Sequence, residues 1–385
     1  MRAVITVVLL ALVTIAFLSA PALVDRSLNR VVQRQPSEPS HAARALFERL
    51  FISDLHADSL LWGRDLARRG SRGHVDVPRL VEGRVALQAF TIVTKAPLGQ
   101  NIDRTHDRFD LVTLLMIARR LPRATWSSLA ERALHQAADL DDLVARSDGR
   151  LAVIRTRSDL DAYLERRRDS DDITAAFLGV EGAHALDGDL ATLERFGAAG
   201  IRMLAPTHFV DTRLGGSAHG LDKGGLTPMG AEMIATMERL GMTLDLAHAS
   251  PALIDDAVAL ATRPVVVSHT GVKGTCDNNR NISDRHLRAI ADTGGVVGIG
   301  YWNTAVCGSN PAAIARAIRH AVDVAGADHV ALGSDFDGAV ATPFDTTGLV
   351  ELVDALLAEG LANQDVAAVM GENVVRVLRA NLPAS

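Results

Sequence analysis

The sequence predicts an α/β fold, a (β/α)8 TIM-type barrel that takes up most of the chain of 385 residues. Short apolar runs alternate with amphipathic stretches from about residue 50 to the C-terminus, a pattern typical of parallel strands joined by helices. Eight such runs occur, which is the strand number of a closed barrel, and this length is ordinary for a barrel of one domain. Polar side chains able to bind metals follow six of the eight runs directly.

The expected strands and helices alternate along the chain. The strands are predicted at residues 50–54, 85–93, 175–180, 201–205, 243–246, 265–267, 296–300 and 330–333. The helices are predicted at residues 107–119, 128–145, 190–198, 230–240, 251–261, 284–293, 311–325, 349–359 and 363–379. Since the connections of parallel strands are right-handed crossovers, the carboxyl ends of all eight strands should gather on one face of the barrel. Residues 109–147 should form a helical insertion between the second and third strands.

The N-terminal segment differs in character from the rest of the chain. Residues 3–24 contain no charged side chain, whereas Arg2 precedes them and Asp25 and Arg26 follow. This pattern predicts that residues 1–24 are a secretory signal peptide or an N-terminal transmembrane anchor. We expect residues 25–41 to be a linker and residues 42–385 to form one catalytic domain. The protein should then be exported, periplasmic or otherwise extracytoplasmic, and held at the membrane by this segment.

Composition limits the class of partner and the kind of metal site. A net charge of −6 and a pI near 6.1 exclude a nucleic-acid partner, which would need a basic surface. With 13 histidines and only two cysteines, a metal site must consist of imidazole and carboxylate ligands. The spacing alone leaves two readings of Cys276 and Cys307 open, a disulfide of an exported protein or two unrelated buried thiols.

The residues that follow the strands are of the kinds that bind divalent cations. His56 and Asp58 are two positions apart, so an extended chain presents both to the same side. Glu181 ends a long apolar run, and a buried carboxylate must be paired or bind a metal. Each residue alone is more often a core or capping side chain, but their convergence on one face favours a zinc site. The full set that follows the strands is His56, Asp58, Glu181, His208, His248, His269 and Asp335.

The ordered set of short motifs resembles the membrane dipeptidase (renal dipeptidase) family, peptidase family M19, over nearly everything after residue 50. The motifs are His56-x-Asp58, Gly179-Val180-Glu181-Gly182-x-His184, Thr207-His208, Asp245-Leu246-Ala247-His248, Ser268-His269, Arg280-Asn281, Gly333-Ser334-Asp335-Phe336-Asp337-Gly338 and the closing Gly371-Glu372-Asn373. Departures from the family pattern include Leu55 and Ala57, which stand where the family usually has Gly and Asn.

The resemblance implies a zinc-dependent dipeptidase with two Zn2+ ions per chain and a hydroxide that bridges them. His56 and Asp58 would bind one ion, His248 and His269 the other, and Glu181 both. His208 would contact the substrate carbonyl or oxyanion, Arg280 would bind the substrate carboxylate, and Asp335 would transfer protons. The family also implies a disulfide between Cys276 and Cys307, a homodimer, and acceptance of a D-residue at the C-terminal position of the dipeptide.

Two alternative functions keep the barrel. One is an amidohydrolase-type metal hydrolase acting on another amide or a lactone, in which a lysine commonly bridges the metals; Glu181 at that position disfavours it. The other is a non-catalytic binding protein, which would be expected to have lost a metal ligand or Asp335. For neighbouring residues we expect a turn or cap role for Asp337, a position beside the site for His184, a substrate wall around His219 and a surface position for His106.

Overall fold

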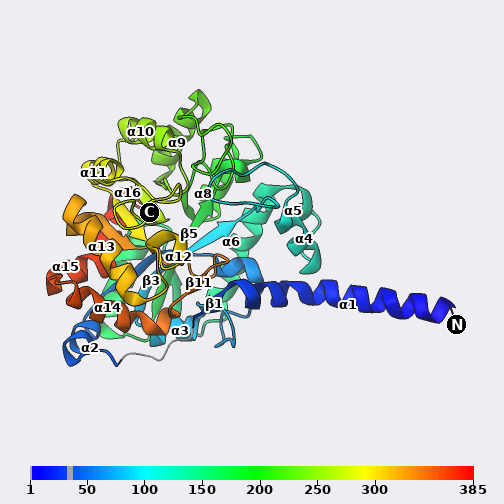
Figure 1. Cartoon of the computed structure of the whole chain (residues 1–385), viewed down its shortest axis with the longest axis horizontal. Coiled ribbons are helices and arrows are strands. Elements are labelled where there is room, and N and C mark those ends of the chain that lie inside the picture. Colours follow the sequence, from blue (N-terminus) through cyan, green and yellow to red (C-terminus); the bar gives the residue numbers. More distant parts are fainter. Residues whose placement is uncertain (1, 33–37) are drawn as a thin grey trace.

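The computed structural model describes residues 2–32 and 38–385 and contains the predicted barrel (Figure 1). Its eight strands are parallel and follow one another around the sheet in the order β7-β6-β5-β3-β2-β10-β9-β8. An additional parallel bridge between Asp245 and Val266 joins the first strand of this order to the last and closes the ring. The strands are β2 (Ile52–Ala57), β3 (Val85–Val93), β5 (Thr174–Glu181), β6 (Ile201–Leu204), β7 (Thr243–Leu244), β8 (Val266–Thr270), β9 (Val296–Ile299) and β10 (Val330–Leu332).

Each of the eight predicted strands has its counterpart in the barrel. Three short strands were not predicted: β1 (Arg30–Val31), β11 (Ala341–Thr342) and β4 (Leu151–Val153). Strand β4 pairs in parallel with the first half of β5. Strands β8, β9 and β10 lie close together around Gly333. A Cβ atom on this residue would lie 2.1 Å from the carbonyl oxygen of Ser268 and 2.9 Å from the Cα of His269. Glycine at this position therefore lets the strand that ends near Asp335 lie against the strand that carries His269.

Helices surround the barrel, and most begin at a residue whose side chain caps the first turn. Thr227, Ser250 and Asn310 each accept a backbone N–H and are each followed by proline, a combination that favours helix starts. The helices are α2 (His41–Phe47), α3 (Val77–Glu82), α4 (Leu111–Ala118), α5 (Ala124–Ser127), α6 (Leu129–Ala145), α7 (Arg157–Asp169), α8 (Thr192–Ala198), α9 (Pro228–Leu240), α10 (Pro251–Leu260), α11 (Asp284–Asp292), α12 (Asn303–Val306), α13 (Pro311–Ala325), α14 (Leu349–Ala358), α15 (Asn363–Ala367) and α16 (Asn373–Asn381).

Two predicted helices differ from the observed ones. The helix predicted at 107–119 begins only at Leu111, because Asp110 caps it by accepting the N–H of Val112. The helix predicted at 363–379 is divided by a π-helical turn, η5 (Ala368–Glu372). At this turn the backbone packs against the start of the barrel, where a Cβ atom on Gly371 would lie 2.1 Å from the carbonyl oxygen of Phe51. The insertion predicted at 109–147 is present as α4, α5 and α6.

Helix α1 (Arg2–Leu28) projects away from the barrel, and only its C-terminal end lies against the domain (Figure 1). Asp25 there is fully buried and pairs with Arg72 at 2.7 Å. Asn29 accepts the backbone N–H of Ala339, and β1 (Arg30–Val31) pairs with β11 (Ala341–Thr342). The first part of the expected linker, residues 25–41, is thus in contact with the barrel, while residues 33–37 lie outside the described residues. Among the residues that the structure describes, we find no helix that is both long and apolar enough to cross a membrane.

Candidate active site

The strand ends bring the predicted site residues together on one face of the barrel. His56 belongs to β2, Glu181 is the last residue of β5 and His269 belongs to β8. The others stand in the loops that follow their strands. None of the seven is more than 8% exposed, so they form one buried polar cluster: His56, Asp58, Glu181, His208, His248, His269 and Asp335.

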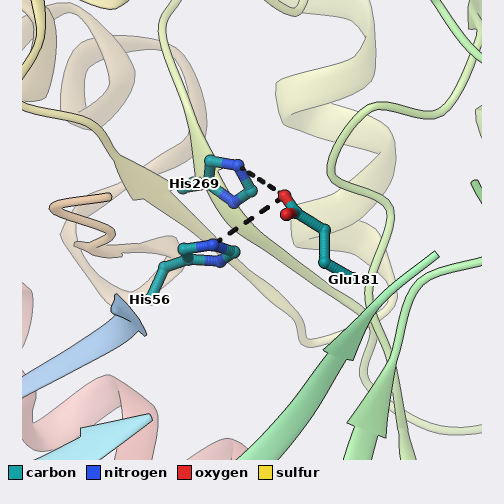
Figure 2. Close-up of side chains that lie close together, drawn as sticks. All are labelled: His56, Glu181 and His269. Carbon is teal, nitrogen blue, oxygen red and sulfur yellow. Dashed lines mark ion pairs between the residues drawn. The ribbon is translucent and has the colours of Figure 1, made fainter. Parts of the chain in front are cut away.

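The carboxylate of Glu181 is the centre of this cluster, and Figure 2 shows it with two of its imidazole neighbours, His56 and His269. Its Oε1 atom lies 2.8 Å from Nε2 of His248, 3.2 Å from Nε2 of His269 and 3.8 Å from Nε2 of His56. Its Oε2 atom lies 3.2 Å from Nε2 of His208. A single carboxylate therefore faces four imidazole nitrogens that come from four different strand ends.

His56 connects Glu181 with the two aspartates of the cluster. Its Nε2 atom lies 3.4 Å from Oδ1 of Asp58 and 3.9 Å from Oδ1 of Asp335. Thr91 donates a hydrogen bond to Oδ1 of Asp58 at 2.6 Å and so fixes that carboxylate. The Nε2 atom of His56 itself is buried and has no hydrogen-bond partner.

These donors fit divalent metal ions. Two ligands that are each ~2.0–2.1 Å from a tetrahedral ion lie ~3.3 Å from one another, close to the separations of 3.2–3.4 Å seen here. The Nε2 atoms of His248 and His269 lie 3.0 Å apart, a distance at which two lone pairs repel unless a proton or a cation lies between them. Three groups could hold an ion: His56, Glu181 and His269; Glu181, His208 and His248; and His56, Asp58 and Asp335.

The hydroxyl of Ser268 orients two of the imidazoles. Its Oγ atom lies 3.1 Å from Nδ1 of His56 and 2.9 Å from Nδ1 of His269. Both rings therefore turn their Nε2 atoms toward Glu181. A partner of this kind on the far ring nitrogen is usual for histidines that bind a metal through the other one.

Two buried aspartates, which sequence reasoning did not single out, hold the strand ends in place. Oδ1 of Asp54 accepts the backbone N–H groups of His56 and Ser334, both at 3.0 Å. Oδ1 of Asp245 accepts the N–H of Ala247 at 3.0 Å and that of Ser268 at 2.8 Å. Each aspartate thus joins the backbone beside one histidine to the neighbouring strand end. The Asp-Leu pair that precedes both His56 and His248 is the sequence signal that could have revealed them.

The backbone at two site residues is strained. His248 has a φ of 62° and Asp335 a φ of 59°, in the left-handed region that side-chain-bearing residues rarely adopt. Such strain costs of order 1–3 kcal/mol per residue and persists only where surrounding contacts enforce it. At both positions the conformation directs a side chain into the cluster.

Arg280 reaches the same cluster from the loop after β8. One terminal nitrogen of its guanidinium donates to the carbonyl of His269 at 2.7 Å and lies 3.4 Å from Nε2 of His248. The guanidinium also stacks over the ring of Trp302, with 5.3 Å between its carbon and the ring centroid. Arg280 is only 6% exposed, so its charge is aimed into the site rather than into solvent.

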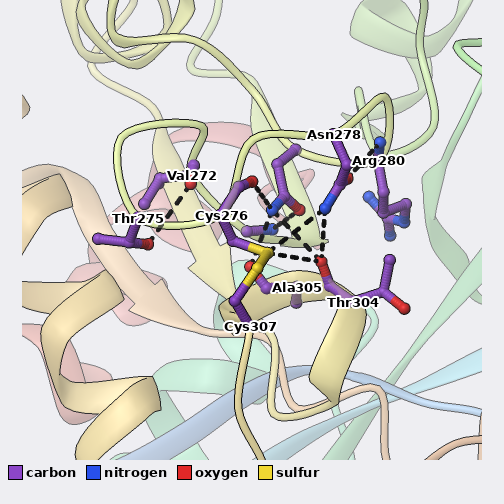
Figure 3. The surroundings of a disulfide bond; sticks show 10 residues. Val272, Thr275, Cys276, Asn278, Arg280, Thr304, Ala305 and Cys307 are labelled. Carbon is purple, nitrogen blue, oxygen red and sulfur yellow. Dashed lines mark hydrogen bonds between the residues drawn. A yellow bond between two sulfur atoms is a disulfide. The ribbon is translucent and has the colours of Figure 1, made fainter.

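The disulfide implied by the family resemblance is present and fastens this loop. Cys276 and Cys307 are bonded, which ties the loop to helix α12 (Figure 3). Asn278 donates to the carbonyl of Thr304 at 2.8 Å in the same region. The loop that carries Arg280 is therefore attached to the barrel at several points.

Burial and mutual charge set the protonation of the site. Burial lowers the pKa of His208, His248 and His269, so these imidazoles are neutral at pH 7 and offer lone pairs. Burial also acts to lower the pKa of His56, but the charges of Asp58, Glu181 and Asp335 outweigh it and raise the pKa to about 10.

The pKa values of two carboxyl groups in the site are higher than that of an exposed acid. Burial, aided by the charge of Asp58, raises the pKa of Glu181. Burial also raises the pKa of Asp335 to about 8, although His56 and Arg280 oppose the shift. Carboxyl and imidazole groups with raised pKa values hold protons in the absence of a metal, and a bound cation would release these protons, as expected of metal ligands.

The neighbouring residues agree with the expectations in part. His219 is fully buried against His248, His106 is exposed, and His184 stacks beside His208 with 6.5 Å between the ring centroids. Asp337 lies in a turn, as predicted, with a φ of 63°, but its side chain does more than the prediction gave it. Its carboxylate is fully buried and accepts hydrogen bonds from Ser59, Arg64 and the backbone of His74, because these residues surround the turn that follows Asp58.

Comparison with known proteins agrees with this geometry. The model of the membrane dipeptidase family (peptidase family M19) matches residues 40–384. An uncharacterised dipeptidase of Schizosaccharomyces pombe is 30% identical over 321 residues, which are 80% of this chain and 72% of the relative. The dipeptidase tcpJ of Claviceps purpurea is 28% identical over 332 residues, 80% of this chain and 69% of the relative.

A solved structure has the same fold over nearly its whole length. A metallo peptidase from Rhodobacter sphaeroides, liganded with a phosphinate mimic of the dipeptide L-Ala-D-Ala, superposes with a TM-score of 0.70 at 28% identity. The superposition covers 86% of this chain and 99% of that one. The barrel, the imidazole–carboxylate cluster and these matches lead to one conclusion: the chain is a metallo-dipeptidase and belongs to the membrane dipeptidase family, peptidase family M19.

Proposed function

We propose that this enzyme is a two-zinc dipeptidase, with His56 and Asp58 on one Zn2+, His248 and His269 on the other, and Glu181 bridging both. The observation that carries the proposal is the carboxylate of Glu181, which faces four imidazole Nε2 atoms within 3.8 Å. Imidazole and carboxylate ligands suit zinc. When bound, such ions would supply Lewis-acid activation of the scissile carbonyl and of the attacking water.

Arg280 is proposed to bind the C-terminal carboxylate of the substrate. Its planar guanidinium can hold a carboxylate through two parallel hydrogen bonds, and its contact with the carbonyl of His269 leaves other N–H groups free for a ligand. Because one guanidinium nitrogen lies 3.4 Å from Nε2 of His248, a carboxylate bound there would bring the C-terminal peptide bond of the substrate nearest to the cluster. In a dipeptide that bond is the scissile one.

His208 and Asp335 are proposed to act on the scissile bond itself. Neutral His208 can donate from one ring nitrogen to the oxyanion that develops on the carbonyl carbon, a contact worth roughly 2.7–4 kcal/mol by analogy with other oxyanion donors. Asp335 faces His56 at 3.9 Å, and in its ionised form a carboxylate there can take a proton from water and give it to the leaving amine.

We further propose that the enzyme accepts a D-residue at the C-terminal position. The support is the Rhodobacter sphaeroides relative, which was solved with a mimic of L-Ala-D-Ala. Comparing kcat/KM for L-Ala-D-Ala and L-Ala-L-Ala tests this point. A rate on the D-containing substrate below a few per cent of the other rate would reject it.

The decisive experiment for the two-zinc site is metal analysis and dipeptide hydrolysis on one preparation of the full chain. We expect about two zinc ions per chain, loss of activity on chelation and recovery on adding zinc. Two ions without turnover of any dipeptide would instead support the amidohydrolase alternative. A chain that binds no zinc even when it is supplied would reject the proposed site.

Export and membrane attachment through residues 1–24 are also proposed. The uncharged run at residues 3–24 and the disulfide, which persists in oxidising compartments, support export. The mass of the mature chain, measured separately in membrane and soluble extracytoplasmic fractions, distinguishes a retained anchor from a cleaved signal. A homodimer is proposed on the family resemblance, and sedimentation equilibrium of the purified chain tests it.

A further inference from the structure

His219 is a buried imidazole beside the metal cluster to which the mechanism above gives no role. It is fully buried, and its ring centroid lies 5.1 Å from that of His248 and 4.9 Å from that of Phe209. The backbone N–H of the preceding residue, Ala218, donates to the carbonyl of His248 at 2.8 Å. The ring of His219 is therefore held at a fixed position next to a proposed metal ligand.

The partners of His219 define which ring nitrogen carries the proton. Nδ1 lies 2.8 Å from the backbone carbonyl oxygen of Ile102. A carbonyl oxygen can only accept a hydrogen bond, so Nδ1 of His219 must be the protonated nitrogen. In a neutral imidazole the other nitrogen, Nε2, then carries a lone pair and can only accept. That atom is buried and has no hydrogen-bond partner in the protein.

A buried acceptor without a partner costs free energy of folding, and in an active site such an atom can accept a hydrogen bond from a bound ligand. The surroundings of His219 indicate which ligand atom this is. His219 and Arg280 both adjoin His248, since the two imidazole centroids lie 5.1 Å apart and a guanidinium nitrogen of Arg280 lies 3.4 Å from Nε2 of His248. Arg280 is the residue proposed to bind the substrate carboxylate. In a dipeptide the N–H of the scissile amide is separated from the terminal carboxylate by a single carbon atom. The other donor, the terminal ammonium group, lies beyond the scissile carbonyl.

We propose that Nε2 of His219 accepts a hydrogen bond from the scissile amide N–H of the dipeptide, which makes His219 a further substrate-binding residue. This inference rests on the proposed role of Arg280. The carboxylate of the substrate would be held by Arg280 and the amide by His219, so that the amide plane is fixed by two contacts on the leaving-group side. The scissile carbonyl is then presented to Glu181 and the imidazoles around it.

A pair of substitutions separates the two ring nitrogens of His219. In His219→Asn the side-chain amide N–H stands near the position of Nδ1, so the bond to Ile102 is kept while the acceptor is lost. In His219→Gln the side-chain amide reaches the position of Nε2, so an acceptor oxygen is kept while the bond to Ile102 is lost. His106→Asn, at an exposed histidine, is the matched control.

The substrates are alanylglycine, which has an amide N–H, and alanylsarcosine, in which a methyl group replaces that hydrogen. We expect His219→Asn in the full-length holoenzyme to lower kcat/KM for alanylglycine by about 3- to 10-fold, the range of a neutral hydrogen bond, and to change the value for alanylsarcosine less than about 2-fold. His219→Gln should lose less than His219→Asn on alanylglycine. If alanylsarcosine turns over too slowly, its inhibition constant against alanylglycine hydrolysis gives the same comparison.

Equal losses on both substrates, with zinc content and thermal stability as in the wild type, would show that His219 acts on the structure and would overturn the proposal. An unchanged rate on alanylglycine would overturn it as well. A wild-type enzyme without activity on alanylglycine or on other dipeptides would instead contradict the proposed function, so the two failures are distinguishable.

Discussion

Replacement of Arg280 tests the substrate-binding geometry most directly. In Arg280→Ala the bound substrate loses its charge-assisted hydrogen bonds to the guanidinium. A hydrogen bond to a charged group contributes ~1.5–3 kcal/mol, and a loss of this size corresponds to a fall in kcat/KM of about 10- to 150-fold. The barrel should remain intact, because within the part of the chain that the structure describes the guanidinium donates to the carbonyl of His269 and otherwise only approaches Nε2 of His248 and the ring of Trp302. Arg280→Lys keeps the charge but not the planar fork, so an intermediate loss is expected.

The assay compares a dipeptide with the same dipeptide amidated at its C-terminus. The wild type should strongly prefer the free carboxylate, mainly through KM, whereas Arg280→Ala should hydrolyse the two substrates with kcat/KM values within about 3-fold of each other. Zinc content, measured on the same preparations, should not change. If Arg280→Ala lost activity on both substrates by the same factor, or if it lost zinc, the guanidinium would be supporting the metal site and the reasoning would be refuted.

Three other predictions concern the metal cluster and its supports. Asp337→Asn should reduce the free energy of unfolding at pH 7 by ~2–4 kcal/mol in urea denaturation. It removes the buried negative charge and one of the two oxygens that accept hydrogen bonds from Ser59, Arg64 and His74. Because the pKa of Asp337 is lowered in the folded state, its contribution to the free energy of unfolding is present above the unfolded pKa of about 4 and is lost as the pH falls below it. If the difference in unfolding free energy between wild type and variant stayed constant down to pH 2, this reasoning would be contradicted. Binding of zinc to the chelated enzyme at pH 7 should release more than about one proton, because His56 with a pKa of about 10 and Asp335 with a pKa of about 8 are protonated beforehand. Calorimetry in buffers of different ionisation enthalpy measures the number of protons released. If no proton were released, the assigned protonation would be refuted. Gly333→Ala should reduce zinc affinity or stability, because its Cβ atom would displace Ser268 and the backbone of His269; unchanged zinc titration and melting curves would argue against that close approach.

The periodicity of the sequence was sufficient for the barrel and for the meeting of the polar residues that follow its strands. Eight apolar runs correspond to the eight barrel strands, and the polar residues that follow them meet at one face because parallel strands share a direction. Helix α6 could be predicted almost to the residue, since Ser128 caps it and an amphipathic pattern follows. These features depend on neighbours in the sequence, and local physical chemistry determines them.

Other features depend on residues that are distant in the chain, and only the tertiary structure decided them. Asp337 became a buried acceptor because Ser59, 278 positions away, lies against it. Asp54 joins the strand that carries His56 to Ser334, 280 positions away. The tautomer of His219 is set by the carbonyl of Ile102, on another loop. Helix α7 and strand β4 were not predicted, because α7 carries a strongly polar sequence with few buried residues and β4 has only three residues. The hydrophobic pattern of the sequence indicates which side of a helix or strand faces the core. The hydrogen-bond partner of a buried polar atom instead depends on which distant residues the tertiary structure brings next to it.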